Sequence, residues 1–212
     1  MKNLILTLTI LFSFVAYVSA QDITLPAPDK KGGKPLMQAL NERQSVRSFT
    51  ETNLTQQQLS DLLWAACGIN RPGKRTSPTA VNYQEIDVYV ALQSGLYLYD
   101  AEKHSLKLIK SKDIRKYTGT QSFAHSAPVN LVLVADMGKA GKKEGVKIDD
   151  SDLLMPYADA GYVSQNIYLY CASAGLGSIV RGSIHKDILA KEMGLRSNQM
   201  ILLAQTVGGI VK

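Results

Sequence analysis

The sequence is poor in the residues that most often build disulfide frameworks and metal sites. It has two cysteines, three histidines and one tryptophan among 212 residues. One pair of cysteines does not make a disulfide framework, and no His/Cys cluster has the spacing of a zinc site. Cys67 and Cys171 both lie among apolar residues typical of helices. We therefore expect two buried thiols and no metal site, with a disulfide as the alternative in an exported protein.

The sequence also lacks a recognisable catalytic set and a concentrated basic patch. His104, His125 and His185 lie far apart and flank no nucleophile motif. The net charge is +6, but the basic residues are scattered, and their densest groups, over residues 30–34 and 139–143, lie beside glycines. This distribution favours a general attraction for small anionic ligands over nucleic-acid binding.

The first twenty residues have the composition of a cleavable signal peptide. Lys2 supplies a positive start, and residues 4–18 form an apolar stretch of fifteen residues. Val18-Ser19-Ala20 then places small residues at the positions that signal peptidase reads. A membrane-spanning helix needs about 20 apolar residues, so an uncleaved anchor is the less favoured alternative. We expect cleavage after Ala20 and a periplasmic or otherwise exported protein with no stable membrane insertion.

The rest of the chain has the length and patterning of one α+β domain. Residues 21–34 contain prolines, glycines and lysines and predict a flexible lead-in, and residues 35–212 suffice for one substantial core. Cap residues and apolar periodicity define the elements. Helices are expected from Pro35, between Thr55 and Gly68, and over 153–174 and 186–193; strands are expected over 85–92, 96–100, 106–110, 130–135, 178–184 and 200–207. This order predicts a sheet layered with helices.

The segment from Arg43 to Arg47 has the side chains of an anion site. In an extended chain the side-chain period is two, so Arg43, Ser45 and Arg47 point the same way, with Val46 opposite. Two forked guanidinium groups and a hydroxyl match the oxygens of a phosphate dianion. A helical continuation would separate Ser45 from the two arginines, and a solvated basic loop is the alternative without function.

A second candidate segment, residues 76–84, lies directly before a predicted strand. Pro78 restricts the chain, and small residues such as Thr79 allow a close approach to the backbone. Asn82 carries both a donor and an acceptor, which suits a ring system or a ribityl chain that offers both. A plain loop leading into the strand is the alternative.

A third candidate is the pair of glycines that ends the long predicted helix. Gly175 and Gly177 are helix caps in the simplest interpretation, but glycines also let a flat ring lie against the backbone. Ser178 and Ile179 follow in the next strand. Gln165, at least one turn earlier in the helix, is a candidate to face the same pocket.

Taken in order, these three segments resemble the nitroreductase family of FMN enzymes, over about residues 35–211. Arg43, Ser45 and Arg47 resemble its Arg-x-Ser-x-Arg phosphate motif. The stretch from Pro78 to Gln84 is similar to its Pro-Ser/Thr-x-x-Asn-x-Gln motif. Gly175-Leu176-Gly177 resembles its helix followed by Gly-Leu-Gly.

This resemblance implies a mixed, mostly antiparallel central sheet flanked by helices, in an intertwined homodimer with FMN at the subunit interface. The Arg-Ser-Arg residues would hold the phosphate and ribityl end, the Pro-Thr-Asn residues would lie along the ring and ribityl side, and the strand after the glycines would lie close to the ring. The implied cofactor-binding residues are Arg43, Ser45, Arg47, Pro78, Thr79, Asn82, Gln165, Gly177, Ser178 and Ile179.

Two features depart from the best-known members of that family. The chain stops at Lys212, where many members continue into an arm that wraps the partner, and Lys212 is a candidate to replace the basic residues of that arm. Arg181 occupies a position in the strand after Gly-Leu-Gly where many relatives carry an apolar residue.

The implied function is an FMN-dependent oxidoreductase that reduces small electron-poor substrates, such as nitroaromatics or quinones, by a ping-pong mechanism. NAD(P)H is the implied electron donor, or another donor because of the predicted export. Two alternatives stay open. One is a specialised flavin dehydrogenase acting on a modified peptide or amino acid derivative, with Lys116-Tyr117 as acid/base partners. The other is an exported flavin-binding protein without turnover.

Overall fold

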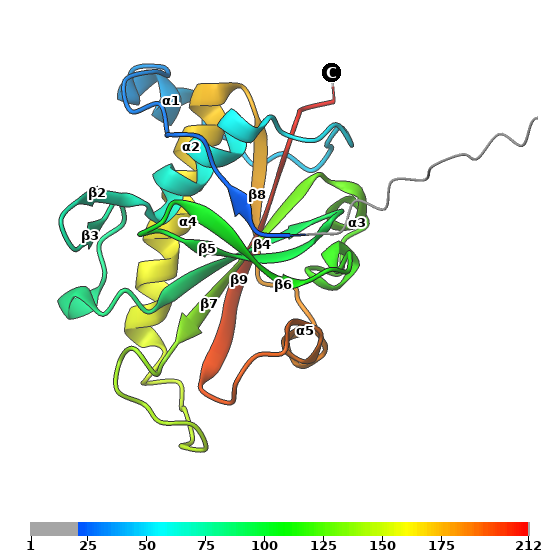
Figure 1. Cartoon of the computed structure of the whole chain (residues 1–212). Helices are drawn as coiled ribbons and strands as arrows, with labels where there is room; N and C mark the ends of the chain where they lie inside the picture. The colour runs from blue at the N-terminus through cyan, green and yellow to red at the C-terminus, as the bar shows by residue number, and fades with distance from the viewer. Residues whose placement is uncertain (1–20, 212) are drawn as a thin grey trace, which may run out of the picture.

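The computed structural model describes residues 21–211, so the predicted signal peptide and Lys212 lie outside the described residues. A seven-stranded sheet in the order β1-β6-β5-β4-β7-β9-β8 forms the centre (Figure 1). Every pairing between these strands is antiparallel. The strands are β1 (Ile23–Thr24), β4 (Ile86–Leu92), β5 (Gly95–Asp100), β6 (Ser105–Lys110), β7 (Val129–Asp136), β8 (Gly177–Arg181) and β9 (Gln199–Gly208); a separate hairpin pairs β2 (Ile69–Arg71) with β3 (Lys74–Arg75).

Helices cover both faces of this sheet. The helical elements are α1 (Leu36–Glu42), α2 (Gln56–Cys67), α3 (Phe123–Ser126), α4 (Leu154–Ala174) and α5 (Lys186–Met193), with short 3-10 turns η1 (Ala80–Asn82) and η2 (Arg115–Tyr117). The main core lies between the sheet and the α2–α4 layer, and a smaller core lies beneath α5 and η2 (Figure 1). The predicted α+β architecture is confirmed.

Strand β7 lies in the middle of the sheet, as its continuous apolar run predicts. All eight of its residues are buried, because it pairs with β4 on one side and β9 on the other. The neighbouring β4 shows the consequence of two covered faces. Val88 packs in the main core and Tyr89 in the smaller core. Alternate side chains of β4 therefore point to two buried faces, and neither face is exposed to solvent.

The two longest helices begin in different ways. The predicted capping box of α2 is present, because Thr55 and Gln58 each accept from the other's main-chain N–H. In contrast, α4 has no side-chain cap. Asp149, an expected cap residue, instead accepts from the N–H groups of Ser151 and Asp152 in its own turn. The helix ends at Gly175 with φ of 70°, a left-handed conformation that favours glycine.

Residues 21–34 are not the flexible lead-in that the sequence predicts. Strand β1 pairs with β6 at the edge of the sheet, and Leu25 is buried in the main core. Further along, the Lys34 N–H donates to Ser173 Oγ at 2.7 Å. Proline and glycine content indicates that this segment forms little regular structure by itself. This composition carries no information about the distant groups that form hydrogen bonds with the backbone of the segment and thereby order it.

A cluster of polar side chains around His104 attaches residues 21–34 to the rest of the domain. His104 Nε2 lies 2.7 Å from Ser60 Oγ and 3.1 Å from Pro26 O, and its Nδ1 lies 2.8 Å from the Tyr99 hydroxyl. The Ser60 hydroxyl also donates to Pro26 O. A neutral imidazole that donates through Nε2 and accepts from Tyr99 at Nδ1 satisfies every contact. Burial lowers the pKa of His104, which maintains this neutral form.

Acidification is expected to weaken this attachment. Because the folded-state pKa of His104 lies below its unfolded value, its stabilising contribution is present above that unfolded value and is lost as the pH falls through the folded pKa. Protonated Nδ1 no longer accepts from Tyr99. We expect the H104N variant to lose less free energy of unfolding than wild type between about pH 7.5 and about pH 5 in urea titrations. Asparagine also tolerates the φ of 48° at this position.

The matched control is His125→Asn, which alters an exposed histidine. This variant should keep the wild-type pH dependence of unfolding. Equal pH dependence in wild type and H104N would show that His104 does not control the attachment.

The two cysteines are free and buried, as predicted. Burial raises the pKa of Cys67 to about 11 and that of Cys171 to about 12, so both stay protonated at neutral pH.

Within residues 21–211, no helix combines the length and the apolar character needed to cross a bilayer.

Candidate functional site

Residues 43–49 run in an extended conformation beside strand β8, as their alternation predicts. Ser45 forms an isolated parallel bridge with Ser178, and the Val46 N–H donates to Ser178 O at 2.9 Å. Farther along, Phe49 forms an antiparallel bridge with Ile210. The segment is therefore attached to the edge of the sheet where β8 begins and β9 ends.

Gly177 permits this close attachment. A Cβ atom at Gly177 would lie 3.0 Å from Val46 Cγ1 and 3.2 Å from Ile210 Cγ1, which is tighter than ordinary van der Waals contact. The glycine of the third candidate segment thus has a packing role, because it lets the first candidate segment lie against the strand. The Val46 side chain lies against this glycine and lines the same cavity as Arg43.

Tyr168 of α4 organises the polar side of the same segment. The Ser45 Oγ lies 3.0 Å from the Tyr168 hydroxyl, which also accepts from the Val180 N–H at 2.9 Å. The Arg43 guanidinium lies over the Tyr168 ring, 5.4 Å from its centre, at a distance that allows cation–π attraction. Sequence analysis missed Tyr168. The only available signal was an aromatic hydroxyl on a nearly uncharged helix.

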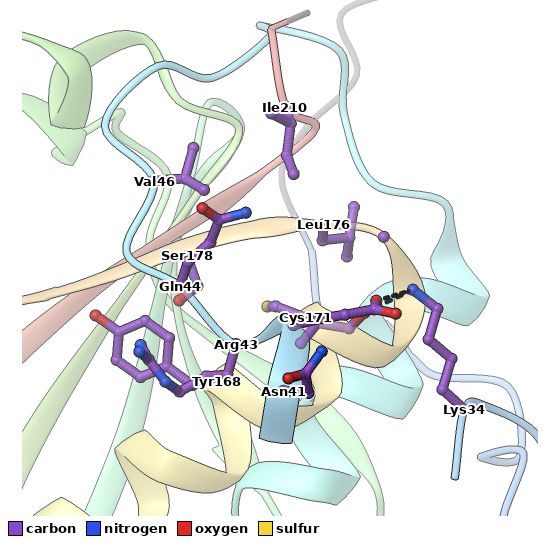
Figure 2. Close-up of a pocket in the computed structure, with 13 residues that line it drawn as sticks. Lys34, Asn41, Arg43, Gln44, Val46, Tyr168, Cys171, Leu176, Ser178 and Ile210 are labelled. Carbon is purple, nitrogen blue, oxygen red and sulfur yellow. Dashed lines mark hydrogen bonds and ion pairs between the residues drawn. The ribbon is translucent and has the colours of Figure 1, made fainter. Parts of the chain in front are cut away.

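A cavity of about 340 Å³ opens beside this segment, where α4 ends and β8 begins (Figure 2). Arg43, Val46 and Tyr168 are among the residues that line it. Figure 2 shows Lys34 on the other side of the cavity, and its ammonium group is paired with the Glu42 carboxylate. Ser45 and Arg47 do not line the cavity; both are exposed. Of the three predicted phosphate ligands, only Arg43 therefore lines the cavity.

Ser178 and Ile179 are buried in the sheet edge, and Ser178 also lines the cavity. The Ser178 hydroxyl accepts from the Gln205 amide at 2.8 Å, and its carbonyl accepts from Val46. Both residues also pair with strand β9. Their side chains and main chain thus hold the sheet edge on which residues 43–49 rest.

Pro78, Thr79 and Asn82 lie elsewhere in the protomer, near the start of α4. The Asp159 carboxylate accepts from the Ala80 N–H at 2.9 Å and so anchors the η1 turn to that helix. Asp159 precedes Tyr168 by nine residues, so the two attachment points are about 14 Å apart along the helix axis.

The η1 turn, together with its flanking residues 79 and 83–84, has unusual backbone dihedral angles. Val81, Asn82 and Gln84 have φ values of 42°, 61° and 52°. Such left-handed conformations in non-glycine residues cost roughly 1–3 kcal/mol each and often occur at functional sites. The amides of Asn82 and Gln84 both donate to Gly73 O, and Thr79 Oγ1 accepts from the Gln84 N–H. These contacts compensate part of the cost and turn the Asn82 side chain toward the β2–β3 hairpin.

Gln165 is exposed on α4 and does not line the cavity beside β8. The structure thus brings Arg43 and Ser45 together with the residues of β8, and leaves Gln165 and the η1 residues apart from them. A single protomer does not bring all the predicted cofactor-binding residues together.

The acid/base partners of the alternative dehydrogenase function, Lys116 and Tyr117, lie in η2, where the ammonium group of Lys116 lies over the Tyr117 ring.

A model of the family described as "Nitroreductase family" matches residues 40–209. The chain belongs to the nitroreductase family. This nitroreductase-family chain is 26% identical over 179 residues to a protein from Methanocaldococcus jannaschii named as a nitroreductase, covering 79% of this chain and 88% of that protein.

Two solved structures relate the fold to known proteins. A nitroreductase-like protein from Ralstonia eutropha superposes with a TM-score of 0.84 at 43% identity, covering 92% of each chain. A chain of the E. coli microcin synthetase McbBCD complex superposes with a TM-score of 0.68 at 21% identity, covering 81% of this chain and 70% of that chain. The second likeness establishes the fold alone, whereas membership of the nitroreductase family supports an oxidoreductase that works with a bound flavin.

Proposed function

We propose that this protein is an FMN-dependent oxidoreductase that reduces small electron-poor substrates, such as nitroaromatics and quinones. The observation that carries the proposal is the donor set Arg43, Ser45 and Arg47 on the segment held by β8. Neither arginine forms an ion pair within residues 21–211. Two cationic groups without a carboxylate partner, beside an exposed hydroxyl, fit the charge and the forked geometry that a phosphate dianion requires.

The protein supplies placement and electrostatics in this proposal. When bound, FMN supplies the electron transfer, first from a donor and then to the substrate in a ping-pong cycle. Arg43 and Arg47 would neutralise its phosphate, and Ser45, oriented by Tyr168, would donate a hydrogen bond to the phosphate or ribityl end. Asn82 would offer its amide to the ring or ribityl side.

The electron donor in this proposal is NAD(P)H or a carrier outside the cytoplasm. The second choice follows from the signal peptide proposed over residues 1–20, which would export the chain to a compartment without a supply of cytoplasmic nicotinamide nucleotides. Stopped-flow reduction with NADH, NADPH and a small electron-transfer protein would distinguish these donors.

We infer a homodimer in which the second protomer completes the site. Leu36 and Met37 on α1 are 63% and 75% exposed, and Tyr162 on the adjoining α4 is 50% exposed. In α1 only Ala39 is buried, so most of the apolar residues that predict this helix face outward. Contiguous exposed apolar side chains are typical of protein interfaces. A partner on this face would bring its own η1 turn and Gln165 toward the Arg43 side of the first protomer.

The interface is tested by the double variant Leu36→Lys/Met37→Lys. Each buried side chain of this size contributes about 1.5–3 kcal/mol, so the dimer dissociation constant should rise at least ~100-fold, with loss of bound flavin. Sedimentation velocity measures the change. Ile188→Lys, which alters a 52% exposed residue on α5, is the matched control and should leave the dimer intact. A monomeric wild type that binds FMN fully would contradict the shared site.

The decisive test of the function is the absorbance spectrum of the purified protein. A yellow protein whose cofactor is released by heat and identified as FMN, and whose flavin is reoxidised by a quinone or nitroaromatic, would support the proposal. A protein that stays colourless after incubation with FMN would refute it. Flavin that no donor reduces would point to a binding protein without turnover.

A further inference from the structure

Two buried acids lie side by side beneath the η1 turn. Glu85, just before β4, is 1% exposed, and Asp159 of α4 is 4% exposed. Asp159 Oδ2 accepts from the Ala80 N–H of this turn, and Glu85 follows the turn directly in the chain. Burial raises the pKa of Glu85, and the neighbouring Asp159 raises it further. Within residues 21–211, no N–H or hydroxyl group donates to either carboxyl oxygen of Glu85. A buried carboxylate without a donor beside a second carboxylate is strongly unfavourable, whereas a protonated one donates to its neighbour.

Charged groups of neighbouring elements surround this pair. Arg75 of β3 faces Glu85, and its Nη1 donates to the Ile86 carbonyl. The charge of Arg75 lowers the pKa of Glu85, but burial raises it by more. Lys139, after β7, is paired with Asp87. Asp136, at the end of β7, is paired with Arg196. No salt bridge to either buried acid is formed within the described part of the chain, and burial together with the neighbouring Asp159 outweighs the attraction of Arg75, which favours a proton on Glu85.

The pair is connected directly to the strained turn. Asp159 Oδ2 accepts from the Ala80 N–H at 2.9 Å, and the three left-handed residues of the turn begin at the next position. Glu85 follows the last of them in the chain. Because left-handed non-glycine residues persist only where their surroundings hold them, the anchor at Ala80 and the position of Glu85 together define the turn.

We propose that Glu85 and Asp159 share one proton and act as positioning residues, which hold Thr79 and Asn82 of the η1 turn in the conformation that binds FMN. This inference rests on the proposed flavin function. In the protonated pair, Glu85 donates to Asp159, and Asp159 accepts from Ala80. Loss of the proton leaves two negative charges in contact. Their repulsion displaces Asp159 and removes the acceptor of Ala80.

The proposal predicts weaker FMN binding at alkaline pH. Burial raises the pKa of Glu85 to about 7, so the protonated pair predominates below neutrality and is lost above it. If only the protonated pair is competent, the apparent dissociation constant for FMN should be about tenfold higher at about pH 8 than at about pH 6. The ionisation of the FMN phosphate acts in the opposite direction, because the dianion binds cations more tightly.

The Glu85→Gln variant separates these effects. Its amide donates to the Asp159 carboxyl group and carries no titratable proton, so we expect E85Q to bind FMN equally well at about pH 8 and about pH 6, or slightly better at the higher value. Asp87→Asn is the matched control, because Asp87 is a buried carboxylate that already has Lys139 as a partner. It should retain the tenfold drop. Fluorescence titration of FMN into apoprotein measures all three proteins.

A second measurement follows the turn without any flavin. Amide hydrogen exchange of residues 79–84 in the apoprotein, corrected for intrinsic rates, should show less protection in wild type than in E85Q at about pH 8, and equal protection at about pH 6. Should E85Q fail to fold, Asp159→Asn replaces it, because its amide donates to Glu85 while its carbonyl accepts from Ala80. Identical pH dependence of binding and exchange in wild type and the amide variant would overturn the shared proton. Absence of FMN binding at every pH would instead refute the proposed function, while the exchange data would still decide on the pair.

Discussion

Replacing Arg43 and Arg47 together by alanine is expected to raise the dissociation constant for FMN by about 100- to 1,000-fold. Hydrogen bonds to charged groups contribute about 1.5–3 kcal/mol each, and the lower part of this range applies because Arg47 is exposed. Loss of two guanidinium–phosphate contacts therefore costs roughly 3–4 kcal/mol. Ser45 alone, held by Tyr168, offers a neutral donor and no charge. Titration of FMN into apoprotein, followed by flavin fluorescence, measures the loss directly.

Lys107→Ala/Lys143→Ala is the matched control for charge. Both lysines are exposed, and their removal changes the net charge of the protein by the same amount. This control should bind FMN within about twofold of wild type, because exposed charges far from a ligand are screened by salt. If the arginine variant keeps its yellow colour at full occupancy, the phosphate site is elsewhere, and the assignment of the three motif residues must be abandoned.

Replacement of Arg181 by alanine is expected to lower the free energy of unfolding by about 4 kcal/mol. Arg181 is 5% exposed, and its guanidinium donates to Thr118 O at 2.7 Å and to Asn130 Oδ1 at 2.9 Å. Burial lowers its pKa to about 10, so it remains charged at neutral pH. Alanine would leave a cavity and deprive the buried Thr118 carbonyl of its donor. Urea denaturation at pH near neutrality measures the change.

Two further variants at arginine positions separate the contributions. Arg181→Met fills the apolar part of the space but restores no hydrogen bond, so we expect it to lose about half as much stability as R181A. Arg71→Ala removes an exposed arginine of the β2–β3 hairpin and should change stability by no more than about 0.5 kcal/mol. If R181A is as stable as wild type, release of a desolvated charge without a counter-ion compensates for the lost contacts.

Local signals in the sequence predicted most of the elements. The Thr55–Gln58 capping box, the apolar run of β7 and the glycine after α4 are each decided by residues close together in the chain, and each is found where expected. The extended conformation of residues 43–49 was likewise read from its own alternation. The segment 21–34 was interpreted wrongly, because its order comes from β6, Ser60 and Ser173, none of which lies nearby in sequence.

The candidate site could be predicted only in part. The motif residues Arg43 and Ser45 were identified from residue type and spacing, but Tyr168, which orients them, carries no motif. Glu85 was visible only as a polar residue at the start of a strand. Its neighbour Asp159 lies 74 positions away on α4, and only their burial side by side makes either one notable.

The sequence by itself determined which segments become helices and strands, and which side chains are available to hold a phosphate, because periodicity, caps and residue chemistry act over a few positions. The tertiary structure alone decided that Ser178 and Gly177 support residues 43–49 and that the η1 turn lies about 14 Å farther along α4. It also decided that, among the described residues, two buried acids lie beside this turn without a salt bridge. The physical reason is that desolvation and contact between distant residues exist only after the helices have packed on the sheet.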